Sequence, residues 1–187
     1  MKQSELNHIL KQHKLWLESN GNKGKKADLT NADLWGADLT EANLTDANLS
    51  GANLTAANLT DANLSGANLT EAKLTDANLT EAKLAEANLT NADLWGADLT
   101  EANLTDANLS GANLTAAYLT NANLTNADLT DANLYRANLH RANLTDSTLN
   151  SKYMAYARVD QSQLSWLATD PNFYDWVDQL DVKKEAA

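Results

Sequence analysis

Cysteine is absent from the 187-residue chain, and proline occurs only once. The lack of cysteine excludes disulfide bonds, thiolate zinc sites and cysteine nucleophiles. Aromatic residues make up 6% of the chain, and no apolar run approaches the roughly 20 residues needed to span a bilayer. The N-terminus also lacks the apolar core of a secretory signal. We therefore expect a cytoplasmic protein with no membrane partner.

Basic residues are scarce as well. The chain has 14 Lys and Arg residues against 25 Asp and Glu residues, a net charge of -11. Proteins that bind nucleic acids gain affinity by neutralising phosphates with a basic face. Direct binding to DNA or RNA is therefore not expected.

A five-residue repeat dominates what is present. Leucine occurs at every fifth position from Leu29 to Leu149, and alanine stands two places before each leucine from Ala27 to Ala142. The unit is Ala, Asp or Asn, Leu, and then two variable residues that are polar or small. Beyond the regular part a weakened frame continues at Met154, at Ala157 with Val159, and at Ser162 with Leu164. With these, the array holds about 28 units.

A period of five residues fits neither a helix nor a straight strand. On an α-helix successive leucines would drift by roughly 140° and cover the whole surface. On a straight strand alternate leucines would point to opposite faces. The chain must therefore bend once per repeat: Ala and Leu, two residues apart, point inward from a short extended piece, and the next two residues turn the corner. Successive coils would then stack about 4.8 Å apart through backbone hydrogen bonds.

Residue usage at the corners agrees with this geometry. All five glycines of the array occupy the second corner position, namely Gly36, Gly51, Gly66, Gly96 and Gly111. Asparagine occurs there too, which is typical of positions with a left-handed backbone. Proline is absent from the array, as expected for a ladder in which nearly every N–H donates a hydrogen bond.

The array resembles the pentapeptide-repeat proteins, whose pattern of Ala, Asp or Asn, Leu, x, x it matches over residues 27–164. The resemblance implies an all-β solenoid, a right-handed quadrilateral β-helix with four repeats per coil. About seven coils would form a rod roughly 30 to 35 Å long. We expect short α-helical caps at both ends.

The first expected cap and its basic connector occupy residues 1–26. Ser4 is the predicted N-cap of a helix from Glu5 to about Ser19, and Asn20 with Gly21 is the predicted stop. The second cap is expected over residues 165–187. Asp170 and Pro171 would begin its helix, with Phe173, Trp176, Val177 and Leu180 at helical spacing.

Candidate catalytic, metal-binding and cofactor-binding residues are not found. His8 and His13 lie five apart in the first predicted helix and so do not share a face. His140 falls at a corner of the array. We interpret the two helix histidines as solvated or half-buried, and the sequence has no Gly-rich phosphate loop or serine nucleophile motif. The prediction is a protein that is not an enzyme and needs no cofactor or metal.

Folding the chain at 20 residues per coil predicts three outward columns. An acidic column consists of Glu41, Asp61, Glu81 and Glu101 and is continued by Asn121 and Arg141. We interpret it as a solvated face, and the alternative is a surface that binds a cation or a basic partner. An aromatic column has Trp35, Thr55, Thr75, Trp95, Thr115 and Tyr135, and a docking role for its two tryptophans is the less favoured alternative to incidental exposure. A threonine column has Thr40, Thr60, Thr80, Thr100 and Thr120. For the threonines, corner hydrogen bonding is favoured over ice binding.

Charge suggests a further alternative. Over residues 27–151, 12 Asp and 5 Glu stand against Lys73, Lys83, Arg136 and Arg141, a net charge of -13. Duplex DNA carries about 18 charges over a similar length of roughly 30 Å. The pentapeptide-repeat proteins that protect DNA gyrase from quinolones mimic DNA in this way, and some dimerise through a C-terminal helix. The resemblance therefore implies gyrase or another topoisomerase as a possible partner.

Residues 29–57 are identical to residues 89–117, an offset of three whole coils. Drift normally blurs positions that face only water, so the identity favours a recent duplication or an engineered consensus array. The main functional prediction is a non-enzymatic structural or scaffold protein, with a designed consensus model of the repeat fold as one form of this prediction. We expect a monomer, with a C-terminal homodimer as the alternative because Trp166, Phe173, Tyr174 and Trp176 supply much aromatic surface.

Overall fold

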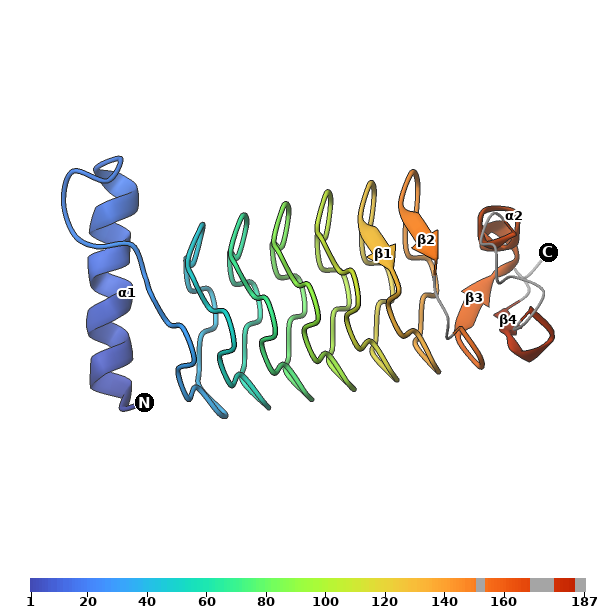
Figure 1. Cartoon of the computed structure of the whole chain (residues 1–187), viewed down its shortest axis with the longest axis horizontal. Coiled ribbons are helices and arrows are strands. Elements are labelled where there is room, and N and C mark those ends of the chain that lie inside the picture. Colours follow the sequence, from blue (N-terminus) through green and yellow to red (C-terminus); the bar gives the residue numbers. More distant parts are fainter. Residues whose placement is uncertain (151–153, 169–176, 184–187) are drawn as a thin grey trace.

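Figure 1 shows the computed structural model as a stack of coils that forms a rod. Helix α1 (Gln3–Glu18) lies across the first coil. Strand β3 (Arg158–Asp160), helix α2 (Leu164–Leu167) and strand β4 (Asp181–Lys183) lie at the other end. The structure describes residues 1–150, 154–168 and 177–183.

Helix α1 is present where a helix is predicted, but it begins earlier. The Lys2 carbonyl accepts the first helical bonds, from the N–H groups of Glu5 and Leu6 at 3.1 Å each. Ser4 therefore lies inside the first turn, and its prediction as the N-cap is wrong: Lys2 takes that place without a side-chain cap. The helix begins at Gln3, one residue before Ser4, so the serine is already helical and cannot be the N-cap.

The predicted stop of this helix is confirmed. Asn20 and Gly21 have φ values of 51° and 83°, and the Gly21 N–H donates to the Trp16 carbonyl at 2.8 Å. Such a left-handed pair reverses the chain at a helix end. The apolar stripe of α1 meets the open first coil, where Leu6 is fully buried.

Backbone pairing sets the size of each coil. From Asp28 with Asn48 to Asn138 with Arg158, the parallel bridges join residues 20 positions apart, which is four pentapeptides. Most faces contribute a single bridge. Longer pairing occurs between β1 (Asp128–Thr130) and β2 (Thr148–Asn150), which are parallel.

The interior of the rod is filled by the repeated Ala and Leu side chains. Every array leucine from Leu29 to Leu144 and every array alanine from Ala47 to Ala142 is buried. Ala32, Ala37 and Ala42 of the first coil are only half-buried, because α1 alone covers that side. The inward pairing predicted from the period of five is confirmed.

Most units also satisfy all five of their backbone N–H groups. In residues 57–61 these donate, in order, to the carbonyls of Leu54, Ala37 and Asn78, to Asn58 Oδ1 and to the Thr80 carbonyl, at 3.0, 2.9, 2.7, 3.2 and 3.0 Å. Three of the bonds are ladder bonds between coils and one closes the corner turn. The fifth is supplied by the Asp or Asn side chain, which explains why the unit carries that residue before Leu.

The second corner position has a positive φ in every unit from Asn31 to Asp146, and again at Tyr156. Values range from 54° at Asn31 to 68° at Gly111, and Glu41 and Ala56 adopt this conformation as the glycines do. Together with the corner hydrogen bond, this is the geometry of a type II turn. Glycine avoids the roughly 1 to 2 kcal/mol that an L-residue loses in this conformation.

The C-terminal end differs from its prediction. After Asp160 the chain leaves the coil for the 3-10 turn η1 (Gln161–Gln163) and α2. Ser162 is exposed, so the weakened repeat frame does not continue through it. Residues 169–176, which include the predicted helix start at Asp170 and Pro171 and the aromatic Phe173, Tyr174 and Trp176, lie outside the described residues, as does the Trp166 side chain.

Val177 and Leu180 do not lie on the predicted α-helix. Val177–Gln179 form a second 3-10 turn, η2, and β4 pairs in parallel with β3, with Val182 opposite Val159. The Asp181 N–H donates to the Ala157 carbonyl at 3.0 Å. An unpaired β3 would leave a row of open ladder groups, so pairing overrides the helical spacing of these residues.

Candidate functional site

The acidic column stacks as predicted. Glu41, Asp61, Glu81 and Glu101 are all exposed at one corner. The backbone N–H of each donates to the carbonyl of the threonine one coil further on, at 2.9 to 3.0 Å. Asn121 and Arg141, also exposed, follow in the same column.

The aromatic column exposes two large rings. Trp35 is 68% exposed and Trp95 is 46% exposed. They occupy equivalent corners three coils apart, and the threonines between them are half-buried. The column therefore presents two separate rings and not a continuous aromatic surface.

The threonine column takes part in the corners themselves. The hydroxyls of Thr40, Thr60 and Thr80 each donate to Oδ1 of the Asp or Asn two residues earlier, at 2.7 Å. A hydroxyl used in this way holds the turn, as the favoured interpretation predicts.

Between Asp28 and Asn143, three positions break the Asp or Asn rule. Lys73, Lys83 and Tyr118 stand before their leucines, and the corner N–H groups of Thr75, Ala85 and Thr120 have no such side-chain acceptor in the described chain. All other such positions between Asp28 and Asn143 keep Asp or Asn. These departures could be seen in the sequence, but their meaning needed the hydrogen-bond pattern.

His13 departs from its prediction as a solvated or half-buried residue, because it is fully buried between α1 and the array. Its Nδ1 accepts a hydrogen bond from the Ala27 N–H at 3.1 Å, and its ring stacks on Trp16 with centroids 5.7 Å apart. Nε2 is buried without a hydrogen-bond partner among the described residues. Burial lowers the pKa of His13, and Lys26 acts in the same direction, against the opposite effects of the Thr45 backbone and Asp46. His8 is exposed.

His140 belongs to a buried polar network where the regular coils end. Its Nδ1 lies 2.6 Å from Oδ1 of Asp160, whose Oδ2 accepts the Arg141 N–H at 2.6 Å. Gln163 Nε2 donates to the carbonyls of Leu139 and Ala142 at 2.9 Å. Elsewhere in the array a backbone carbonyl and a backbone N–H of the next coil fill the places taken here by Asp160 and Gln163. The side chains of Asp160 and Gln163 therefore supply the acceptor and the donor that the backbone of a further coil would otherwise supply.

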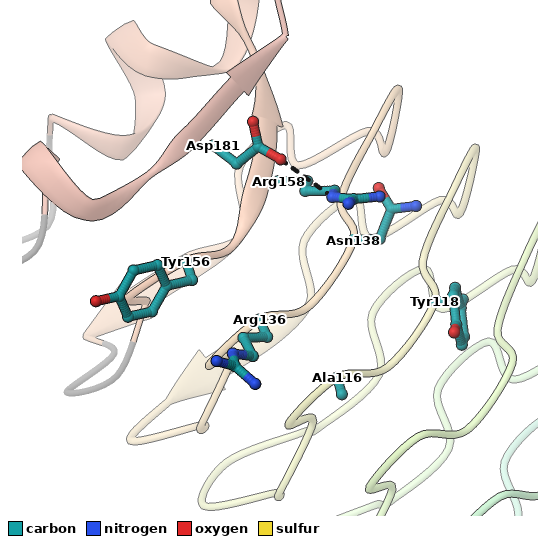
Figure 2. Close-up of a pocket in the computed structure, with 7 residues that line it drawn as sticks. All are labelled: Ala116, Tyr118, Arg136, Asn138, Tyr156, Arg158 and Asp181. Atoms are coloured by element: carbon teal, nitrogen blue, oxygen red, sulfur yellow. Dashed lines mark ion pairs between the residues drawn. The ribbon is translucent and has the colours of Figure 1, made fainter.

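Beside this network lies a groove of about 520 Å³, lined by Ala116, Tyr118, Arg136, Asn138, Tyr156, Arg158 and Asp181. Figure 2 shows that these side chains come from successive coils and from β4. A smaller hollow of about 230 Å³ shares Asn138, Arg158 and Asp181 with it and also touches His140.

Aromatic rings hold one arginine of the groove in place. The Arg136 guanidinium lies 5.2 Å from the centre of the Tyr135 ring and 5.9 Å from that of Tyr156. The two rings meet edge to face at 5.7 Å. Arg158 Nε contacts Asp181 Oδ2 at 3.1 Å. This groove was not predicted from the sequence, although Tyr118 interrupts the repeat and Arg136 is one of only three arginines in the chain.

Two further observations concern the described part of the chain. Its His, Asp and Glu residues form no group of three that could hold a metal ion. None of its helices is long and apolar enough to cross a membrane.

Comparison with solved structures finds pentapeptide-repeat proteins. Rfr23 from the cyanobacterium Cyanothece 51142 is 40% identical over 52% of this chain, with a TM-score of 0.40, and the chain spans 63% of its length. HetL from Nostoc sp. strain PCC 7120, involved in heterocyst differentiation regulation, is 33% identical over 70% of this chain and 73% of its own, with a TM-score of 0.29. QnrB1, a plasmid-mediated fluoroquinolone resistance protein, is 16% identical over 79% of this chain and 83% of its own, with a TM-score of 0.46.

No curated protein sequence matches the chain. The family model described as pentapeptide repeats (8 copies) matches residues 25–61, 47–84, 82–121 and 112–150, which together cover most of the chain. The chain therefore belongs to the pentapeptide-repeat proteins, which form right-handed quadrilateral β-helices.

Proposed function

We propose that the protein is a non-enzymatic structural or scaffold rod of about seven coils, closed at each end by its flanking segments. The hydrogen-bond pattern of the repeat carries this proposal. In units such as residues 57–61 the outward Asn and Thr side chains hold the corner, so the groups available for chemistry in other folds are used here for structure. The repeated surface thus offers rigidity and spacing.

The proposal extends to origin and assembly. The identity of residues 29–57 with residues 89–117 supports an engineered consensus array, since surface positions such as Trp35 and Trp95 are repeated as faithfully as the core. We propose a monomer because the acidic sides of two rods repel one another. A C-terminal homodimer is the alternative.

A second function, an acidic DNA mimic that binds DNA gyrase or another topoisomerase, is favoured by one observation. The four exposed carboxylates from Glu41 to Glu101 follow one corner, with a step of about 4.8 Å, on an array of net charge -13. A row of this kind can occupy a surface that neutralises phosphates.

A gyrase supercoiling assay separates the two functions. For the scaffold we expect no inhibition of supercoiling, and no protection from a quinolone, at micromolar protein. A variant with Glu41, Asp61, Glu81 and Glu101 changed to Gln or Asn is the matched control. Inhibition that weakens with added salt and disappears in this variant would establish the DNA mimic in place of the scaffold. Light scattering of the same sample distinguishes monomer from dimer.

A further inference from the structure

The outward surface changes its chemistry at Tyr118. Residues 29–57 and 89–117 are identical, and the identity ends at the next residue, where Asn58 corresponds to Tyr118. Asn58 accepts the N–H of Thr60 at 3.2 Å. Tyr118 offers no such acceptor to Thr120, and its side chain is 53% exposed, so it gains little burial in return. The array thus gives up a corner hydrogen bond at this place for a ring that faces water.

The ring does not stand alone. All three arginines of the chain, Arg136, Arg141 and Arg158, lie within the next 40 residues, and two of them line the groove with Tyr118 and Tyr156. Sites that depart from the local structural rules are where function is expected. Tyr118 is such a departure, and it shares one groove with two cations of complementary chemistry.

The two cations of the groove differ in their partners. No ion pair joins Arg136 to a carboxylate of the described chain, while the Tyr135 and Tyr156 rings fix its position. Asp181 engages Arg158 at Nε, and Figure 2 shows the rest of that guanidinium extending toward Asn138. A guanidinium presents several donors in one plane, which suits a carboxylate or phosphate.

We propose that this groove binds a small aromatic anion, that is, a planar ring bearing a carboxylate or a phosphate. The anionic group accepts hydrogen bonds from Arg136 and Arg158, and the ring packs on the exposed ring of Tyr118. The volume of about 520 Å³ lies within the range of small-molecule sites. The distant carboxylates of the acidic rod are screened beyond about 8 Å at physiological salt, so the groove acts by contact. This inference does not depend on the scaffold role.

Titration calorimetry of the full chain with 1-naphthoate and 1-naphthyl phosphate tests the proposal and separates the two anionic groups. The neutral 1-naphthamide and inorganic phosphate alone are the ligand controls. We expect one site for at least one of the aromatic anions, and affinity about tenfold lower for the amide, since a charge-assisted hydrogen bond is lost.

Three variants locate the site. Arg136→Gln should weaken binding about tenfold. Tyr118→Asn should also weaken it while raising the melting temperature, because the corner bond returns; that rise distinguishes a lost ligand contact from unfolding. Asn58→Tyr, which places the ring where no arginine follows, should add no second site. Equal affinity for 1-naphthoate and 1-naphthamide, unchanged binding in Arg136→Gln, or no binding at millimolar ligand would overturn the proposal.

Discussion

The Oδ1 atom of Asn103 accepts two hydrogen bonds from Thr105, from the backbone N–H at 3.1 Å and from the hydroxyl at 2.7 Å. No other group of the repeat reaches this N–H, because the ladder and the corner turn use the remaining donors and acceptors. In units with Asp or Asn before the leucine, one side-chain oxygen therefore satisfies the corner N–H that the backbone leaves open.

Replacing Asn103 by Ala should lower the free energy of unfolding by about 1 kcal/mol, since it removes the acceptor for the Thr105 N–H. For a chain of this size the melting temperature should fall by about 2 to 4 °C. Asn103→Asp is the control, because a carboxylate keeps the oxygen in place, as Asp98 does for Thr100. Equal melting temperatures for the Ala and Asp variants would contradict this role.

The converse change should stabilise the rod. Lys83 stands where Asn belongs, and Lys83→Asn would give the Ala85 N–H its missing acceptor. We expect a gain of about 1 kcal/mol relative to Lys83→Ala, which removes the same charge without adding an oxygen. Denaturant unfolding of the two variants measures the difference. A Lys83→Asn chain no more stable than Lys83→Ala would show that the corner needs no side-chain acceptor.

The coil could be predicted from the sequence because a leucine at every fifth residue from Leu29 can be buried throughout only if the chain bends once per repeat. The corner bond of Asn58 could not, since Asp and Asn suit many turns and only the full set of acceptors shows which N–H remains. The C-terminal end was mispredicted at Val177 and Leu180. Strand β4, which follows them, pairs with β3 through Val182 and Val159, and helical spacing does not reveal such a tertiary contact. The groove at Arg136 could not be predicted, because its lining comes from successive coils and from β4, which are about 20 residues apart in the sequence.

The join between α1 and the array should be sensitive to acid. The pKa of His13 is lowered by burial, and the protonated ring could not accept the Ala27 N–H. Its stabilising effect is therefore present above the ordinary histidine pKa of 6.5 and is lost as the pH falls through the lower folded value. We expect the melting temperature of the intact chain to decline over this range.

His13→Phe is the matched control for that experiment, because it keeps a ring against Trp16 and cannot titrate. Its melting temperature should change less between pH 7.5 and about pH 5. Asp28 and Asp38 act in a separate window: hydrogen bonds from the Thr30 and Thr40 side chains lower the pKa of each carboxyl, so their contribution is lost only below about pH 4. Parallel declines of the two chains above pH 5 would contradict the role of His13.

The inward packing of the leucines is tested most directly by thermal melts of Leu89→Asp and Thr90→Asp. Leu89 is fully buried in the middle of the rod, whereas Thr90 is a half-buried corner residue whose replacement can reach water. We predict that Leu89→Asp loses several kcal/mol of stability, because it buries an unpaired charge, and that Thr90→Asp loses about 1 kcal/mol or less. Equal tolerance at the two neighbouring positions would contradict a rod built around an Ala and Leu interior.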